Sequence, residues 1–501
     1  MSRQIAVALA ALALLIGATL AADRVVAAPV APSAAFTEDV EVSSGTWYCV
    51  PLPRPGETAT VTIAAVGDEP SRVTVENIRD GAAEFDDRRE LAPNETLELQ
   101  LEGGETPPAV VVRWRGGPVV TSWTADAEDG QRLGASCSPS PAPRWLLPGA
   151  VTTVGSSTRL YLFNPFDSDA VVRVAFATPE GRVNLVSSEN VSVPARQVVD
   201  VGINELQPEQ PDLGMIVEVE AGRVIATGLQ RFGQPDLPEI ELEGAELSSD
   251  PTAPEGRTVL EATAADATTA GFAYAAAGES TSSWISVQNP NTRPLRLTMT
   301  ATDQIDAAAG TEEIIVGPES VARIDLDGAS SAPNFGVLLR STNDATFVAN
   351  GFMALTGDDT AVTSFPGVPA VDRISAQAAA PDGSAPEVAV FNPGDAAATL
   401  AISMGGSVPD DWSSLQLAPG EMQLLSAADV GLDGGSPVTV AADQPVYGAL
   451  RLSSDDSRAQ GVLTLPLLPA TSWTGSSQVV DPEHDQTLET RPVEFPVQPE
   501  G

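Results

Sequence analysis

The chain has 501 residues, a length that suits about three or four domains rather than one. It carries 68 acidic residues against 26 basic ones, all of them arginine, for a net charge of −42. A surface this acidic repels nucleic acid and anionic lipid headgroups, so we expect no nucleic-acid partner.

The composition favours many short strands. Hydrophobic residues make up 43% of the chain, which is enough for packed cores. Its 42 prolines and 42 glycines are scattered throughout, as in strands joined by turns, and a helical protein would tolerate far fewer. We therefore predict an all-β fold.

The N-terminus is typical of an exported protein. Arg3 precedes an uncharged apolar run from Ile5 to Ala22, which is intermediate in length between a signal-peptide core and a spanning helix. Small-residue cleavage sites follow Ala22 and Ala28. We predict that residues 1–28 form a signal peptide or a signal-anchor helix. The remainder is then extracytoplasmic, secreted or anchored to the cell membrane by this segment alone.

The chain has only two cysteines, Cys49 and Cys137. In an exported protein a pair of cysteines favours one structural disulfide over a metal site. The bridge would close a long loop and contribute about 4–5 kcal/mol by chain entropy. We expect it to link a position before the first strand of the first domain to one after its last strand.

Three segments share an Asn-Pro dipeptide at the end of an apolar stretch. Apolar residues then recur at positions 8, 10 and 12 after the asparagine, with the period of a half-buried strand. Proline lacks an N–H for a sheet and disfavours helix before it, so we interpret the dipeptide as a corner between strands. The three pairs are Asn164-Pro165, Asn289-Pro290 and Asn392-Pro393.

A proline turn follows each corner after 27 to 30 residues, and a strand pair follows the turn. The turn prolines are Pro194, Pro318 and Pro419, and a degenerate upstream copy has Pro93. In that copy Ala65 occupies the corner position, so the Asn-Pro dipeptide itself is lost.

These landmarks predict four tandem repeats of about 100 residues with six or seven strands each. That size favours immunoglobulin-like β-sandwiches over propeller blades, which take about 40–50 residues. An acidic, Pro-rich linker would separate the first two repeats from the last two, and we consider a packing in two pairs. The predicted ranges are repeat 1 at 44–138, repeat 2 at 143–232, linker at 233–257, repeat 3 at 258–366, repeat 4 at 372–468 and a disordered tail at 469–501.

The sequence resembles an exported actinobacterial family catalogued as domain of unknown function number 5719. The resemblance rests on TWYCVPLP (46–53), the cysteine before RWLLPGA (144–150), the YLFNP strand end and the V-x-V-P turn. It covers most of the chain after the leader and implies an envelope location and β-rich repeats. It brings no known activity, cofactor or catalytic residue, and the first repeat departs from the pattern by lacking Asn-Pro.

Residue types for most catalytic chemistry are missing. The only histidine, His484, lies in the polar tail, and there is no lysine, so Ser-His-Asp, Cys-His and lysine-nucleophile mechanisms are excluded. We expect no cofactor and no zinc site. Three acidic loops (124–130, 356–360 and 453–457) lack the EF-hand pattern, and turns explain them better than Ca²⁺ does.

The leading hypothesis is a non-catalytic, extracytoplasmic β-sandwich protein that serves as a structural or interaction module of the cell envelope. Its partner would be an envelope protein or polysaccharide, and the sequence does not indicate an oligomeric state. The alternative is a carbohydrate-binding envelope protein that uses some of the seven tryptophans, although their strand context favours packing. A glycoside hydrolase that uses carboxylates alone is the third hypothesis.

Overall fold

The computed structural model describes residues 44–66, 69–126, 131–233, 254–302, 309–356, 360–368, 371–377, 384–431, 436–454 and 462–467. All of them belong to one compact unit, Val42–Gly501. The predicted leader (1–28), the predicted tail (469–501) and most of the predicted linker lie outside the described residues.

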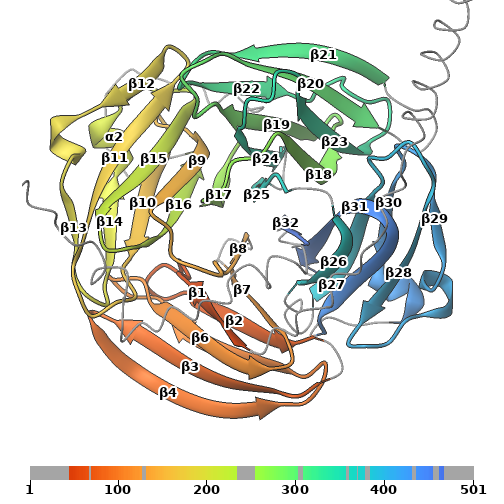
Figure 1. Ribbon diagram of the computed structural model, residues 1–501, viewed down its shortest axis with the longest axis horizontal. Coiled ribbons are helices and arrows are strands. Elements are labelled where there is room, and N and C mark those ends of the chain that lie inside the picture. Colours follow the sequence, from red (N-terminus) through yellow and green to blue (C-terminus); the bar gives the residue numbers. More distant parts are fainter. Residues whose placement is uncertain are drawn as a thin grey trace, which may run out of the picture. The chain divides into compact units, whose positions relative to one another are not determined.

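The described chain is almost entirely β-structure, arranged in antiparallel sheets (Figure 1). Its helices are single turns: η1 (Val186–Ser188), α2 (Ile203–Leu206), η2 (Asp410–Trp412) and η3 (Ala427–Val430). No helix among the described residues is long and apolar enough to cross a membrane.

The first eight strands form two four-stranded sheets, which we call sheet pair 1. The orders are β1-β6-β3-β4 and β5-β2-β7-β8. The strands are β1 (Ser44–Cys49), β2 (Thr58–Ala65), β3 (Ser71–Arg79), β4 (Ala82–Leu91), β5 (Thr96–Glu102), β6 (Ala109–Gly116), β7 (Val119–Asp126) and β8 (Arg132–Ser136).

Sheet pair 2 has the orders β9-β15-β11-β12 and β14-β10-β16-β17, with β13 added beside β11. Its strands are β9 (Arg144–Ala150), β10 (Ser157–Phe163), β11 (Ala170–Thr178), β12 (Gly181–Asn184), β13 (Val191–Val193), β14 (Val198–Gly202), β15 (Leu213–Ala221), β16 (Ile225–Phe232) and β17 (Gly256–Glu261).

Sheet pair 3 has the orders β18-β23-β20-β21 and β22-β19-β24-β25. Its strands are β18 (Thr269–Ala276), β19 (Thr281–Gln288), β20 (Leu295–Thr302), β21 (Ala309–Val316), β22 (Val321–Asp325), β23 (Asn334–Ser341), β24 (Val348–Leu355) and β25 (Ala361–Pro366).

In sheet pair 4 one strand serves both sheets. The 17-residue β31 pairs with β26 and β28 through its first half (438–446) and with β27 and β32 through its second half (447–454). The strands are β26 (Val371–Gln377), β27 (Ser384–Phe391), β28 (Ala398–Met404), β29 (Leu415–Leu417), β30 (Met422–Ser426), β31 (Val438–Ser454) and β32 (Val462–Pro466). The sequence had predicted two strands in the span of β31.

The same strand order recurs in sheet pairs 1 to 3: the first strand of each pair lies beside the third strand from the end, and the last strand lies beside the next-to-last at a sheet edge. In sheet pair 4, β31 takes both of these positions and pairs with the first strand, β26, and the last, β32. The two sheets of pair 3 share one hydrophobic core, to which β20 and β23 contribute from one sheet and β19 and β24 from the other. Packing across that core requires alternate residues to face inward. The predicted alternation after the Asn-Pro corners is confirmed in β11, where Val172, Val174 and Phe176 are fully buried.

The last strands of the four pairs lie together at the centre of the unit (Figure 1). β17 contacts β8 and β25, and β32 likewise contacts both β8 and β25, so the four form a closed ring. Side chains of β17 and β25 meet where Thr258 Oγ1 lies 2.9 Å from Ser364 Oγ, and the Thr464 N–H of β32 donates to Thr363 Oγ1 at 3.1 Å. A cyclic contact replaces the packing in two pairs that the linker had suggested.

One boundary differs from the prediction. Residues 256–261, divided by prediction between the linker and repeat 3, form β17, which pairs with β16 in the second sheet pair. Each pair needs this last strand to cover the edge of its next-to-last strand, and an uncovered edge leaves backbone donors and acceptors unpaired. The third sheet pair begins only at β18.

Neighbouring sheet pairs come into close contact at glycine residues. An ideal Cβ on Gly336 of β23 would lie 2.5 Å from the ring of Phe391 in pair 4, and one on Gly214 of β15 would lie 2.7 Å from Gln288 in pair 3. The side chains that face these glycines belong to Phe391 and Gln288, and each of these residues directly precedes the asparagine of an Asn-Pro corner. Glycine is required at these positions because any side chain would collide with the neighbouring pair.

Candidate functional site

A cavity of about 370 Å³ lies where three of the four central strands end. It is lined by the ends of β8, β17 and β25 and by the residues after them, namely 136–140, 261–265 and 366–368. Tyr48, Trp145, Ile225 and Phe347 contribute to its wall. Ala264 and Ala265 are exposed, so the loop after β17 lies at its mouth.

Glu261 is the one residue with a carboxyl group among the described lining residues of this cavity. It is the last residue of β17, opposite Thr227 of β16. The preceding Val259 and Leu260 are buried, so strand geometry carries the carboxyl group inward at the strand end. Its Oε1 is fully buried and has no hydrogen-bond partner.

Burial raises the pKa of Glu261 from 4.5 to about 8, because a desolvated carboxylate is disfavoured. A hydrogen bond from the Ser136 backbone opposes this and lowers the pKa by less. The carboxyl group is therefore mainly protonated at pH 7 and presents an O–H donor.

Two other polar side chains of the wall are bonded within the protein. Trp145 Nε1 donates to the Val224 carbonyl at 2.9 Å, and Ser138 Oγ donates to the Ser140 carbonyl at 3.2 Å. The cavity offers mainly apolar surface, some hydroxyl groups and one carboxyl group, without a cationic side chain among its described residues.

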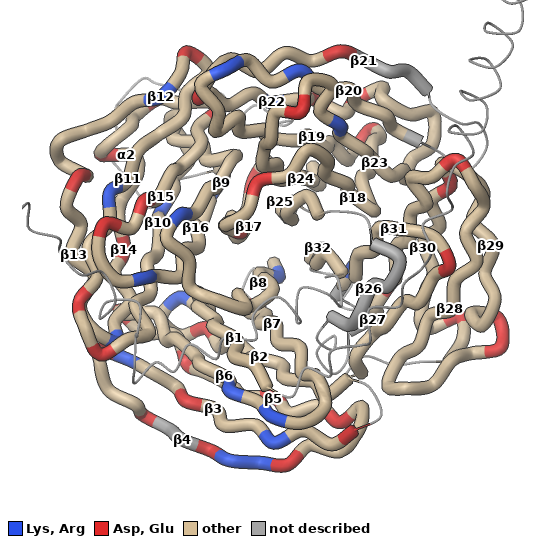
Figure 2. Tube along the Cα trace, in the orientation of Figure 1, with Lys and Arg blue, Asp and Glu red and all other residues tan. Residues whose placement is uncertain are grey.

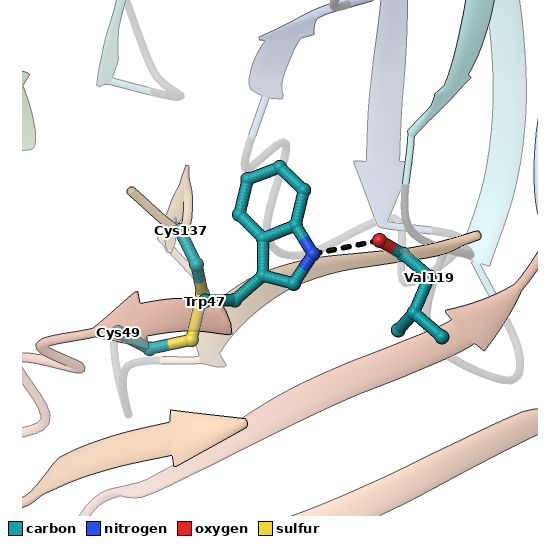
Figure 3. The surroundings of a disulfide bond; sticks show 4 residues. All are labelled: Trp47, Cys49, Val119 and Cys137. Carbon is teal, nitrogen blue, oxygen red and sulfur yellow. Dashed lines mark hydrogen bonds between the residues drawn. A yellow bond between two sulfur atoms is a disulfide. The ribbon is translucent and has the colours of Figure 1, made fainter. Parts of the chain in front are cut away.

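The predicted disulfide is present and borders this cavity. Cys49 and Cys137 are bonded, with Cα atoms 4.6 Å apart, and Cys137 is part of the wall (Figure 3). Cys137 follows β8 as expected, but Cys49 is the last residue of β1 rather than a residue before it. Beside the bridge, Trp47 Nε1 donates to the Val119 carbonyl at 2.6 Å.

The three Asn-Pro asparagines are fully buried at strand ends, away from this cavity. Asn392 Nδ2 donates to the carbonyls of Ala396, Leu417 and Ala418, and its Oδ1 accepts from the Gly394 N–H. Asn164 and Asn289 repeat the pattern, bonding the carbonyl four residues on and the carbonyls before the proline turn. The side chain thus joins the corner to the turn. Of the prolines that follow, Pro393 lines a second pocket of about 260 Å³.

The turn prolines precede residues with left-handed backbone. In three of the turns the residue with a positive φ comes directly after the proline: Asn94, Glu319 and Gly420. After Pro194 it is the second residue, Arg196. Only one of these four positions is occupied by glycine. Ala65, which replaces asparagine in the first copy, keeps the equivalent backbone bond, since its N–H donates to Glu95 O at 2.9 Å.

Six of the seven tryptophans are described, and all six are at most 4% exposed: Trp47, Trp114, Trp123, Trp145, Trp284 and Trp412. They give no stacking platform for sugars within the described chain. Trp473, His484 and most of the three acidic loops lie outside the described residues. Within the described part, no group of three His, Cys, Asp or Glu residues could hold a metal ion.

Sequence reasoning missed Glu261. It is one of 68 acidic residues, and nothing in the local sequence TVLEAT marks it as buried. Its only signal is an acid at the end of an apolar strand, and the cavity into which it points exists only because three sheet pairs meet there.

A model of a protein family described as "Family of unknown function (DUF5719)" matches residues 104–380. The chain matches no curated protein. Among solved structures, it is similar to a glycoside hydrolase family 32 protein from Bifidobacterium adolescentis, with 10% identity, coverage of 85% of this chain and 96% of that one, and a TM-score of 0.14. A Streptomyces avermitilis alpha-L-rhamnosidase complexed with L-rhamnose has 8% identity and a TM-score of 0.11; the match covers 78% of this chain and 55% of that one. These TM-scores are too low to support any functional argument.

Proposed function

The chain belongs to the DUF5719 family, which has no assigned activity, and we propose that it is a non-catalytic structural or interaction protein of the cell envelope. The proposal includes its architecture: the four sheet pairs are four tandem immunoglobulin-like domains, preceded by an N-terminal hydrophobic helix. The recurring strand order supports this assignment.

The observation that carries the proposal is a buried ion pair that joins two of the sheet pairs. Arg257 of β17 donates to both carboxylate oxygens of Glu57 in pair 1, at 2.8 and 3.2 Å, with both side chains at most 7% exposed. Its backbone N–H donates to Gln131 Oε1 at 2.9 Å. Together with the ring of central strands, this buried clamp holds the pairs in one fixed arrangement, as a scaffold requires.

The surface suits an extracytoplasmic partner. Acidic residues and arginines lie mainly along the outer strands and loops (Figure 2). The disulfide is consistent with an oxidising compartment. An envelope protein would bind the outer surface, and the membrane would be contacted only through residues 1–28.

Catalysis is the less supported reading. Glycoside hydrolysis needs two carboxyl groups about 5–10 Å apart, and the described lining of the main cavity supplies only Glu261. Carbohydrate binding without hydrolysis is the remaining alternative, but none of the six described tryptophans forms an exposed platform.

The test combines localisation with two assays on the purified full chain. An epitope-tagged chain in intact cells should be accessible to external protease and carry the Cys49–Cys137 bridge by non-reducing mass spectrometry, whereas deletion of residues 1–28 should leave it protected and reduced. A panel of chromogenic glycosides should give no turnover, and a glycan array no binding. Turnover that Glu261→Gln abolishes would establish an enzyme, and saturable glycan binding would establish the carbohydrate alternative; either result overturns the proposal.

A further inference from the structure

We propose that the cavity at the ends of β8, β17 and β25 binds a small, uncharged, largely apolar molecule whose single oxygen acceptor takes a hydrogen bond from the Glu261 carboxyl group. This is a small-molecule site in addition to any scaffold role.

The space and its walls define the body of the ligand. A volume of about 370 Å³ falls within the range of small-molecule sites, which are mostly apolar with a few fixed polar groups. Tyr48, Trp145, Ile225 and Phe347 supply large apolar surfaces. Since the Trp145 N–H is already bonded to Val224, that side chain offers the ligand only its apolar surface.

The charge of the site excludes anions. No arginine is among its described lining residues, and Glu261 is the one carboxylic acid among them. An anion would meet a buried carboxyl group with no cation to compensate it. Divalent metals are also disfavoured, because they require several oxygen ligands and no cluster of three ligating side chains exists in the described chain.

The protonated form of the Glu261 carboxyl group favours a ligand with a neutral hydrogen-bond acceptor over an organic cation. A cation would need the carboxylate, and burial disfavours that form, as the pKa of about 8 reflects. In the protonated form the group donates one hydrogen bond, and Oε1 has no partner within the protein. A buried polar group without a partner is costly, so a carbonyl or ether oxygen placed there gains binding free energy.

Access comes from the loop between β17 and β18. Ala264 and Ala265 are exposed and line the cavity, so entry requires no movement of the central strands. Their small side chains leave the mouth open beside Glu261.

The experiment uses the full chain with three cyclic ketones of increasing size, cyclohexanone, camphor and menthone, and their parent hydrocarbons, in ligand-observed NMR titrations. At pH 6 at least one ketone should bind about tenfold more tightly than its hydrocarbon. Binding should weaken about tenfold between pH 6 and pH 9, because deprotonation around pH 8 removes the donor.

Three variants test whether the preference for ketones over hydrocarbons depends on Glu261. Glu261→Gln keeps an N–H donor and should bind ketones at a pH-independent affinity, whereas Glu261→Leu should bind ketone and hydrocarbon equally. The control Glu255→Gln alters an exposed acid outside the cavity and should match the parent. Circular dichroism establishes that each variant is folded.

Three outcomes would overturn the proposal. The first is that no ketone binds the parent chain. The second is a ketone preference that survives Glu261→Leu, which would place the site elsewhere. The third is tighter binding of cyclohexylammonium than of any ketone, rising with pH and lost in Glu261→Gln, which would identify a cation site instead.

Discussion

At the residue scale, two buried polar side chains have opposite roles. Asn392 satisfies three backbone carbonyls and leaves none of its own bonding capacity idle. Glu261 lines the cavity and has a buried oxygen, Oε1, without a hydrogen-bond partner. A satisfied polar group specifies local structure, whereas an unsatisfied one beside a cavity is available to a ligand. The asparagine corner is therefore structural, and the glutamate is the candidate for function.

We expect Asn392→Ala to lower the free energy of unfolding by about 1–3 kcal/mol, because three backbone carbonyls, one in a buried contact and two in part-buried ones, lose their donor. Urea denaturation measures the change. The control Asn184→Ala removes an exposed side chain with one surface hydrogen bond and should change stability by less than about 0.5 kcal/mol. Equal effects of the two substitutions would contradict a structural role for the corner.

The raised pKa of Glu261 predicts a pH dependence of stability. Between about pH 5 and 8 the folded chain retains a proton that the unfolded chain has lost, so stability falls as pH rises, by up to about 1.4 kcal/mol per pH unit. The difference between the parent and Glu261→Gln in urea unfolding at pH 5.5, 6.5 and 7.5 isolates this contribution. A constant difference across that range would show that Glu261 is not buried as described.

At the element scale, β17 has the largest effect on how the chain is organised. It extends the second sheet pair through β16, reaches pair 1 through Arg257 and contacts β25 through Thr258. Its sequence GRTVLE contains both the clamp arginine and, at its end, the cavity acid. One strand therefore links the fixed arrangement of the pairs to the candidate site.

Arg257→Met should destabilise the chain by about 3–5 kcal/mol, because Glu57 is left buried without its partner. The double variant Glu57→Leu/Arg257→Met removes both charges and should recover most of that loss. Chemical denaturation of the four members of this cycle measures the coupling. The exposed pair Arg72–Glu90 serves as the control, and Arg72→Met should cost less than about 1 kcal/mol; a double variant no more stable than Arg257→Met would contradict a clamp based on charge pairing.

At the scale of the whole molecule, the ring of central strands joins sheet pair 1 to sheet pair 4. β8 of pair 1 lies against β32 of pair 4, and an ideal Cβ on Gly134 would lie 2.6 Å from Leu463 Cδ2 and 2.6 Å from the Trp123 carbonyl oxygen. The close approach depends on a residue without a side chain. Closing the ring also covers the last-strand edges that would otherwise invite pairing with another chain.

Gly134→Val should open the contact between β8 and β32. We expect a loss of about 1–3 kcal/mol from overpacking, with faster hydrogen exchange of the Thr464 amide. The matched control is Gly278→Val, since an added Cβ at Gly278 meets nothing within 4 Å. Unchanged exchange in β32 of the Gly134 variant would argue against closure of the ring at this point.

Local patterns were sufficient to predict the β-rich fold, the Asn-Pro corners and the disulfide pair of this protein, but not that β31 is one continuous strand. The alternation in β11 and the Asn-Pro corners depend on residues close together in the sequence. The disulfide follows from the presence of only two cysteines. Both kinds of information can be read directly from the sequence. The partner of β17, the ring and the cavity depend on contacts between distant residues, such as Glu57 and Arg257, which are 200 positions apart. An edge strand of this composition can pair with the sheet before it or the sheet after it, and only packing decides between them. For the same reason Glu261 became distinguishable from the other acidic residues only when three sheet pairs enclosed it.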